Sequence, residues 1–209
     1  MLCSIASAAT LNVGSNQKYK TIQSAVNAAH DGDTIKVASG TYKETVTFQK
    51  GLTILGTNYP KVNGFYAQEG GGGGIINGFS IQKDGVSSGY AGECLIRNNY
   101  FYNCGVDIWG GPSGGSTIMN NQITGGTISL YDTGGITITG NTISKSKCGL
   151  SIGDSMRAPM PTVSKNTFKN CNYGVYIYSD IGDPGKLTTF SGNKYIGNKV
   201  NIGWGTKSF

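Results

Sequence analysis

Charged side chains are scarce in this chain, and their scarcity excludes several fold classes. Only 13% of its 209 residues are charged, about half the share of an ordinary soluble domain. Helical bundles and coiled coils need charged solvent-facing stripes and few glycines, whereas Gly occurs 34 times here. No apolar run approaches the ~20 residues that span a membrane. Because hydrophobic residues make up 37% and aromatic residues 10%, disorder is excluded too, and a protein of strands and turns remains.

Histidine and arginine are almost absent from the chain. His30 is the single histidine and only Arg97 and Arg157 are arginines, so lysine provides nearly all of the formal charge of +6. The lysines are scattered along the sequence, which argues against a basic stripe for nucleic acid. As a weaker inference, the positive sign favours acidic partners such as uronate polymers.

The five cysteines lack the spacing of a metal site or a CxxC motif. Cys104, Cys148 and Cys171 fall five to seven residues after a recurring Asn, which predicts small buried thiols rather than bridges. Residues 1–10 contain an A-x-A sequence, so they are either the remnant of a trimmed export signal or the first strand. Residues 11–209 are expected to form a single domain.

One pattern of short alternating strands and Gly or Asn turns recurs from about residue 75 onwards. Its copies are anchored by the apolar residues Ile108, Leu130, Ile152, Ile177 and Ile202 and by Asn99, Asn121, Asn141, Asn166 and Asn193. The apolar spacings are 22, 22, 25 and 25 residues. Coils of this length bury their apolar faces only by stacking about 4.8 Å apart, so the repeat predicts a parallel β-helix. Each anchor Asn is expected at a coil corner, in the left-handed conformation and bonded to the next coil.

The two ends of the predicted solenoid differ. Helical spacing occurs near the N-terminus, in Ile22, Ala25, Val26 and Ala29. With Thr21 as N-cap, we expect a helix around residues 21–30 that covers this end. The C-terminal end has no helical pattern, so Trp204 and Phe209 or a partner are expected to close it, and self-association through this end is one alternative.

Several motifs resemble right-handed parallel β-helix proteins of the pectin lyase-like superfamily. They are Tyr19–Val26 (YKTIQSAV), Gly32–Ile35 (GDTI), Gly40–Tyr42 (GTY) and Leu52–Gly56 (LTILG). The coils after Gly78 resemble repeats of its NosD-like and carbohydrate-binding/sugar-hydrolase branch. The resemblance covers nearly the whole chain and implies an all-β, right-handed single-stranded parallel β-helix with a short N-terminal capping α-helix. It specifies function poorly, because this scaffold hosts lyases, hydrolases, epimerases, esterases and adhesins.

The catalytic signatures of that superfamily do not match this chain. Gly-His-Gly, typical of polygalacturonase-like enzymes, is absent because His30 is the single histidine. The Asp-Pro-His of alginate epimerases is absent as well, since Asp183-Pro184 is followed by Gly185. The Asp pair and Arg of pectin methylesterase-like enzymes are also missing from the central coils.

A column of acidic residues is the candidate catalytic and metal site. Aligned coils place Asp132 and Asp154 two positions after the apolar anchor, with Asp180 beside the equivalent position. Stacked carboxylates would bind Ca²⁺ through their oxygens, which makes Asp132, Asp154 and Asp180 the metal candidates. Together with Arg157, they resemble the arrangement of Ca-dependent pectate lyases, which implies Asp132, Asp154 and Arg157 as catalytic candidates. Turn formation is the alternative role for Asp and Ser after a strand.

Aromatic residues flank this column and are the candidates for binding a glycan. Their rings would stack on the apolar faces of sugars beside polar groups. The candidates are Trp109, Tyr131, Tyr176, Tyr178 and Asp107. An outward Tyr is also simply a good strand residue.

These observations favour an exported, non-catalytic β-helix, secreted or on the cell surface. We expect it to bind a polysaccharide or cell-wall glycan, or to act as a scaffold or adhesin. Nucleic acid, a membrane span and a required cofactor are not expected, and Ca²⁺ at the acidic column is the one optional ion. The alternative is a compact, Ca-dependent polysaccharide lyase or related uronate-active enzyme.

Overall fold

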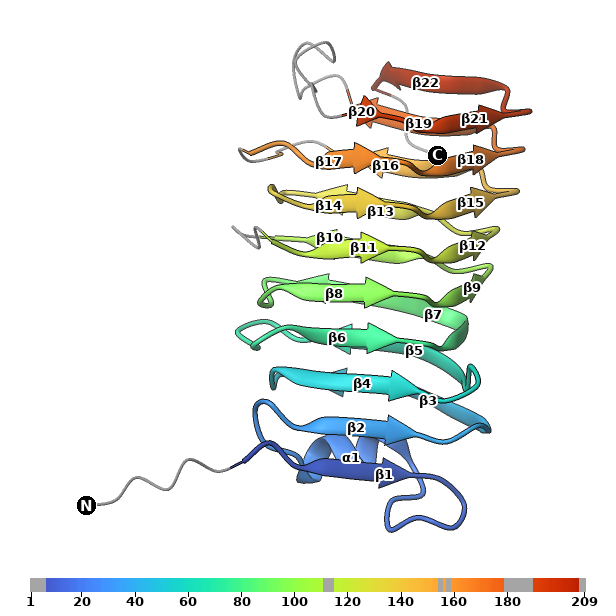
Figure 1. Ribbon diagram of the computed structural model, residues 1–209. Helices are drawn as coiled ribbons and strands as arrows, with labels where there is room; N and C mark the ends of the chain where they lie inside the picture. Colours follow the sequence, from blue (N-terminus) through green and yellow to red (C-terminus); the bar gives the residue numbers. More distant parts are fainter. Residues whose placement is uncertain (1–6, 111–114, 154–155, 157–158, 179–189, 207–209) are drawn as a thin grey trace.

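A computed structural model describes residues 7–110, 115–153, 156, 159–178 and 190–206. Its strands wind around a common axis and stack coil upon coil, from β1 at one end to β22 at the other (Figure 1). Neighbouring coils pair through parallel strands. The expected all-β parallel β-helix is therefore confirmed, and so is a short helix near its N-terminus.

The first sheet runs the length of the described solenoid and has nine strands there. In spatial order these strands are β1 (Thr10–Val13), β2 (Thr34–Val37), β4 (Leu52–Gly56), β6 (Gly74–Asn77), β8 (Cys94–Arg97), β11 (Thr117–Met119), β14 (Thr137–Thr139), β17 (Thr162–Ser164) and β20 (Phe190–Ser191). Their middle residues point inward. Ile118, Ile138 and Val163 share one such column and are fully buried, which is the stacking that the period predicts.

The second sheet forms the rest of each coil. In the N-terminal half it contains the long strands β3 (Thr41–Phe48), β5 (Lys61–Ala67) and β7 (Ser80–Gly89). In each later coil, two shorter strands replace the single long strand. At the change from one pattern to the other, β9 and β10 both pair with β7. The first set comprises β9 (Tyr100–Tyr102), β12 (Gln122–Thr124), β15 (Thr142–Ser144), β18 (Thr167–Lys169) and β21 (Lys194–Ile196). The second set comprises β10 (Val106–Trp109), β13 (Ile128–Tyr131), β16 (Cys148–Ile152), β19 (Tyr173–Tyr178) and β22 (Val200–Gly205).

The apolar anchors lie in register as predicted, with one correction at the last coil. Their paired residues in β10, β13, β16 and β19 are Ile108, Leu130, Ile152 and Ile177. In β22, however, Ile202 pairs with Val175, and Trp204 is the partner of Ile177. The prediction that Ile202 ends this column was wrong by two residues, because an alternating strand keeps the same inward face when it shifts by two positions.

A ladder of buried asparagines fixes the corner between the two sheets. The Nδ2 of Asn121 donates to the Ile96 carbonyl at 2.9 Å, and its Oδ1 accepts the backbone N–H of Asn99 at 3.0 Å. The same pattern recurs at Asn99, Asn141 and Asn166. The expected structural role is confirmed, but the left-handed backbone belongs to the preceding residue, as in Asn98 (φ 54°) and Asn120 (φ 55°).

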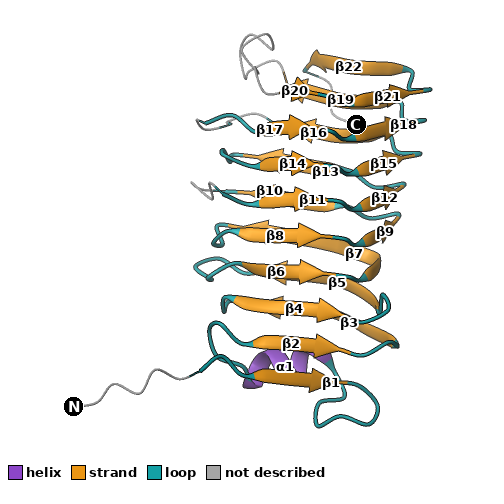
Figure 2. Cartoon of the chain, viewed as in Figure 1, coloured by secondary structure: helices purple, strands orange, loops and turns teal. Residues whose placement is uncertain are grey.

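The helix α1 (Ile22–Ala28) covers the N-terminal coil beside β1 and β2 (Figure 2). Thr21 is its N-cap, as expected, because the Thr21 hydroxyl oxygen accepts the Ser24 N–H at 3.2 Å. The Glu44 carboxylate of β3 accepts two more N–H groups of the first turn, at 2.8 and 3.0 Å. The described residues contain no helix of the length and apolar character that a membrane crossing requires.

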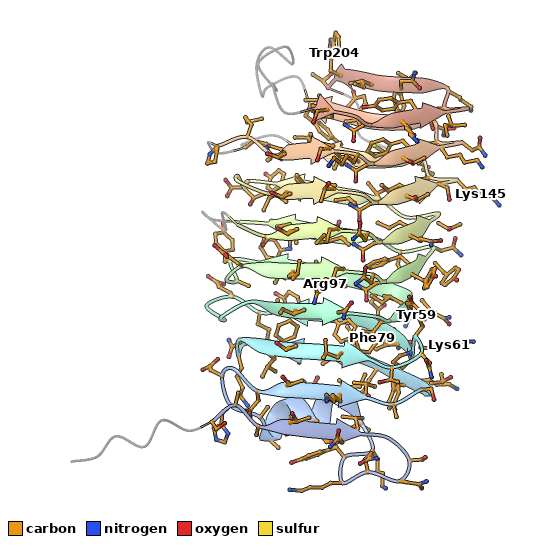
Figure 3. The ribbon with its side chains drawn as sticks, viewed as in Figure 1. Tyr59, Lys61, Phe79, Arg97, Lys145 and Trp204 are labelled. Carbon is orange, nitrogen blue, oxygen red and sulfur yellow. The ribbon has the colours of Figure 1, made fainter. Side chains whose placement is uncertain are left out.

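The last described coil leaves inward-facing apolar positions exposed. Val200 and Ile202 are each 38% exposed and Trp204 is 63% exposed. Their partners in β19, such as Val175 and Ile177, are buried. Trp204 projects beyond β22 (Figure 3), and Phe209, the other predicted closing residue, lies outside the described residues.

Candidate functional site

Three exposed rings lie on successive coils where the second-sheet strands end. Tyr90, Trp109 and Tyr131 are 46%, 38% and 52% exposed, and we call them the aromatic row. Trp109 and Tyr131 are register partners in β10 and β13. The Tyr90 and Trp109 rings meet edge to face, with centroids 5.7 Å apart. The row therefore offers several ring surfaces along the solenoid axis.

Glycines on adjacent coils hold these rings in place. A Cβ atom built on Gly89 would overlap the Trp109 indole, and one built on Gly110 would overlap the Tyr90 ring. The Trp109 Nε1 also donates to the Ser87 hydroxyl at 3.4 Å. Because these rings pack against the backbone of a neighbouring coil, their orientation is set before any ligand arrives.

A polar row runs beside the aromatic row, on the same outward face of the second sheet. It consists of the register partners Ser87, Asp107, Ser129 and Ser151. Asp107 is exposed as a residue, yet its carboxylate is partly desolvated by its neighbours. This burial raises the pKa of Asp107, and a hydrogen bond with the Ser129 hydroxyl opposes the rise. Rings beside hydroxyl and carboxylate groups suit a hydroxylated ligand, because the polar groups fix its orientation.

The other predicted residues of this face have different surroundings. Tyr176 is only 3% exposed, since its ring packs edge to face against Tyr173 at 5.2 Å and Tyr178 at 5.4 Å between centroids. Tyr178 is half-buried. Tyr176 therefore supports the neighbouring rings rather than offering a face of its own.

The acidic column is only partly described. Asp132 is half-buried and has a left-handed backbone with φ 47°, which is a turn conformation. Asp154, Arg157 and Asp180 lie outside the described residues. The calcium site and the catalytic constellation therefore stay predictions.

Tyr90 is the residue of this face that sequence reasoning missed. It follows β7, whose Val86 and Ser87 are register partners of Val106 and Asp107. Gly89 is therefore the residue of this coil that shares a column with Trp109 and Tyr131. Tyr90 lies one position later, so extending the alignment one coil backwards would not have placed it in that column.

The side chains that bind transition metals are dispersed or buried in the described residues. His30 is 92% exposed, and the charged group near it is Asp33 at 3.8 Å. Cys94, Cys104, Cys148 and Cys171 are buried free thiols. Burial raises the pKa of Cys148 to about 12, and its thiol donates to the Leu150 carbonyl at 3.2 Å. No group of three or more His, Cys, Asp or Glu that could hold a metal occurs among the residues described.

Comparison with family models identifies a match over most of the chain. A family model described as periplasmic copper-binding protein (NosD) matches residues 26–208. No curated protein and no solved structure matches the chain. The cysteine and histidine side chains described above do not fit the copper ion of the family's name, because Cu(I) prefers accessible thiolates, whereas these thiols are buried, and Cu(II) prefers grouped imidazoles. Since the match runs from α1 through the stacked coils to β22, the chain belongs to the NosD family of β-helix proteins.

Proposed function

We propose that this chain is an exported, non-catalytic β-helix that binds an acidic polysaccharide or cell-wall glycan through the aromatic row. The observation that supports this most directly is the set of three pre-oriented rings beside the polar row. A polysaccharide lying along the solenoid axis would meet one ring and one polar group per coil, about 4.8 Å apart. Ring surfaces supply contact area, and the Asp107 and serine side chains bond sugar hydroxyls.

The distribution of lysine supports an acidic ligand. After Asp132 the sequence has eight lysines and Arg157 against three aspartates, Asp154, Asp180 and Asp183. The described lysines of this stretch are Lys145, Lys147, Lys165, Lys169, Lys194 and Lys199. The Lys145 N–H donates to the Lys169 carbonyl at 3.1 Å across neighbouring coils, and Lys145 projects from the solenoid beside β15 (Figure 3). Lysines that are scattered in sequence therefore share one region of the molecule, and together they attract a polyanion.

The family's name supports export. The matched model is described as periplasmic, and a periplasmic protein and a secreted or cell-surface protein must all leave the cytoplasm. We place this chain, as part of the same proposal, in the exported class, where wall glycans and extracellular polysaccharides are available. A scaffold or adhesin role is compatible with glycan binding, because an adhesin attaches through the same kind of surface.

Binding is tested by pull-down of the purified protein with a panel of acidic polysaccharides, with and without Ca²⁺. Trp109→Ala and Tyr131→Ala should each weaken binding about tenfold, as expected for exposed aromatic anchors. Tyr102→Ala is the matched control, because Tyr102 is 46% exposed but lies on β9. If the row variants bind as tightly as the wild type, the aromatic row is not the glycan site.

The same tubes test the lyase alternative through the ultraviolet absorbance of unsaturated products. Calcium-dependent absorbance that Asp154→Ala and Arg157→Ala abolish would replace our proposal with a polysaccharide lyase. Pull-down without absorbance supports the binding module. If neither signal appears with any polysaccharide, glycan binding is contradicted and a scaffold role is favoured.

We also propose that the C-terminal coil associates with a second copy of the chain. The exposed Ile202 and Trp204 side chains occupy positions whose partners in the preceding coil are buried, and a second copy would cover them. Sedimentation velocity over a range of concentrations should show a dimer in the wild type and a monomer for Trp204→Lys. A monomer at every concentration in the wild type would contradict this association.

A further inference from the structure

A polar hollow of about 420 Å³ lies at the corner where the first sheet turns into the second. Four successive coils contribute to it, from the turn after β4 to the start of β12. We call it the corner hollow. Its volume falls within the range of about 300–1,000 Å³ that is usual for ligand sites. It lies away from the aromatic row, which stands at or directly after the ends of β7, β10 and β13.

Two tyrosines form an aromatic wall of the corner hollow, although a whole coil separates them in the stack. The Tyr59 and Tyr100 rings meet edge to face with centroids 4.7 Å apart. The coil between them contributes Gly78, which has no side chain, and Phe79, whose side chain is fully buried. Since no side chain of that coil fills the gap, the Tyr59 ring spans it. Tyr59 is 45% exposed, so the pair leaves a ring surface available to a ligand.

The backbone before β5 holds the Tyr59 ring in this position. Asn58 and Tyr59 both have left-handed backbones, with φ 56° and 53°, a conformation that is rare for a bulky side chain. A Cβ atom built on Gly56 would overlap the Gly78 carbonyl and the Pro60 ring, so this turn packs tightly against the next coil. Strained residues that tight packing holds in place are concentrated at ligand sites, which favours a binding role for Tyr59.

Amide side chains provide the polar lining of the corner hollow. Asn98 and Asn120 occupy equivalent positions on adjacent coils, and the Asn98 Nδ2 donates to the Asn77 Oδ1 at 2.9 Å. Gln122, the register partner of Tyr100, adds a further amide. Within the described residues, the side chains of Asn120 and Gln122 make no hydrogen bond. Their amides, each with two N–H donors and one carbonyl acceptor, are therefore available to a ligand.

The residues that line the corner hollow are all uncharged. A carboxylate or phosphate that entered it would lose part of its hydration without gaining an opposite charge from the lining. Hydroxyl groups are different, because each one both donates and accepts, as the amides around it do. Rings beside amides therefore favour a neutral, hydroxylated ring over an anionic ligand.

We propose that the corner hollow binds one neutral pyranose unit of a glycan. The Tyr59 and Tyr100 rings contact the apolar C–H face of the sugar, and the Asn120 and Gln122 amides bond its hydroxyls. This site goes beyond the proposed function, which assigns an acidic ligand to the aromatic row. It uses other residues, and its ligand carries no charge.

The test titrates small probes against the full chain by NMR, with amide shifts as the readout. Glucose, galactose and N-acetylglucosamine are the neutral rings, glucuronate and galacturonate are charged counterparts, and sorbitol offers hydroxyls without a ring. At least one neutral sugar should bind, with shifts centred on the residues around Tyr100 and Asn120. A uronate should bind no more tightly than its neutral counterpart. Sorbitol should bind about tenfold more weakly, because it lacks the ring face that the tyrosines contact.

Variants identify the residues that bind the sugar. Tyr59→Asn removes the ring but keeps a residue that tolerates the left-handed backbone, and it should weaken binding about tenfold, whereas Tyr59→Phe should retain binding. Gln122→Ala should weaken binding about fivefold, as expected for one lost hydrogen bond, and should keep the melting temperature of the unliganded protein. Tyr102→Ala is the matched control, because Tyr102 is also exposed on β9 but does not line the hollow. Trp109→Ala should likewise leave monosaccharide binding unchanged.

Four outcomes would overturn the proposal. Tighter binding of a uronate than of its neutral counterpart would contradict a neutral ligand, and equal affinity for sorbitol would contradict contact with the sugar ring. Binding that Trp109→Ala removes and Tyr59→Asn leaves intact would assign the sugar to the aromatic row. Absence of shifts with all three neutral sugars would contradict the site itself. Failure of polysaccharide pull-down alone would contradict only the proposed function, since the corner hollow shares no residue with the aromatic row.

Discussion

The Asn121 side chain links three consecutive coils through its amide and its backbone. Its Nδ2 reaches the carbonyl of Ile96 in the preceding coil, its Oδ1 accepts the N–H of Asn99, and its own N–H donates to the Asn141 Oδ1 at 3.0 Å. Asn121 is 1% exposed, so water does not replace these bonds. Each ladder asparagine therefore satisfies backbone groups that the corner turn would otherwise leave unpaired.

Asn121→Ala should lower the free energy of unfolding by about 3 kcal/mol, because it leaves a buried carbonyl and a buried N–H without partners at about 1–3 kcal/mol each. Denaturant titration measures the loss. Gln122→Ala, at the next and exposed position, is the control and should change stability by at most about 0.5 kcal/mol. Equal losses in the two variants would show that the ladder bonds do not stabilise the corner.

Asp33 makes the stability of the N-terminal coil depend on pH. Its carboxylate accepts the backbone N–H groups of His30 at 2.8 Å and Ala9 at 2.7 Å, and these two bonds lower the pKa of Asp33 below its ordinary value. The stabilisation is complete above the ordinary carboxyl pKa of about 4. It is lost as pH falls through the lower pKa of the folded state, because protonation removes the acceptor charge.

Asp33→Asn should therefore flatten the acid limb of a plot of melting temperature against pH. The wild type should lose stability as the pH falls below about 4, whereas the variant should be less stable above that range and change less within it. Glu69→Gln is a matched control at an exposed carboxylate and should follow the wild-type curve. An unchanged acid limb in Asp33→Asn would assign the acid sensitivity to other groups.

At the scale of elements, α1 is held in place by side chains of β3. Glu44 accepts the N–H groups of Ile22 and Gln23, and Gln23 in turn bonds the Thr47 backbone N–H at 2.8 Å and carbonyl at 2.9 Å. The helix thereby satisfies its own first turn and some of the edge groups of β3. In a solenoid each coil contacts its neighbours only, so the stability of the cap is a local quantity.

Glu44→Ala should cost about 1 kcal/mol, the usual effect of removing an N-terminal cap, and the cost should be local. Hydrogen exchange should become faster in α1, β1 and β2 and stay unchanged in β13 and β16. Lys43→Ala, an exposed neighbour on β3, is the control and should leave every rate unchanged. Uniformly faster exchange along the whole chain would mean that the solenoid unfolds as one unit.

At the scale of the whole molecule, the period of the sequence was sufficient to predict the fold. Two independent anchors recur together, and any parallel stack of such coils brings equivalent residues such as Ile108 and Leu130 into register. The error at Ile202 arose because a strand that alternates inward and outward offers several inward residues, and only the pairing with β19 decides which one continues a column. The period of the sequence therefore predicts that the coils stack, while the register of the last strand depends on how β22 pairs with β19.

The sites were less predictable than the fold, because they depend on neighbours in other coils. Trp109 and Tyr131 could be predicted as outward residues from alternation alone, but the burial of Tyr176 depends on the rings of Tyr173 and Tyr178. The contact between the Tyr59 and Tyr100 rings had no sequence signal, since the two residues are far apart in the chain. The clustering of lysines was hidden for the same reason.

Because the family is described as copper-binding, the addition of copper is the most direct test at the scale of the whole molecule. A cysteine must lose its proton to bind copper, and burial raises the pKa of the Cys148 thiol to about 12. We therefore expect that one equivalent of Cu(I) or Cu(II) leaves the melting temperature unchanged, because a ligand that binds the folded state would raise it. Calorimetry with metal analysis after gel filtration measures both quantities, and His30→Ala controls for weak Cu(II) binding at the exposed imidazole. A stoichiometric complex that persists in His30→Ala would show that the chain assembles a copper site from residues that the described coils keep apart.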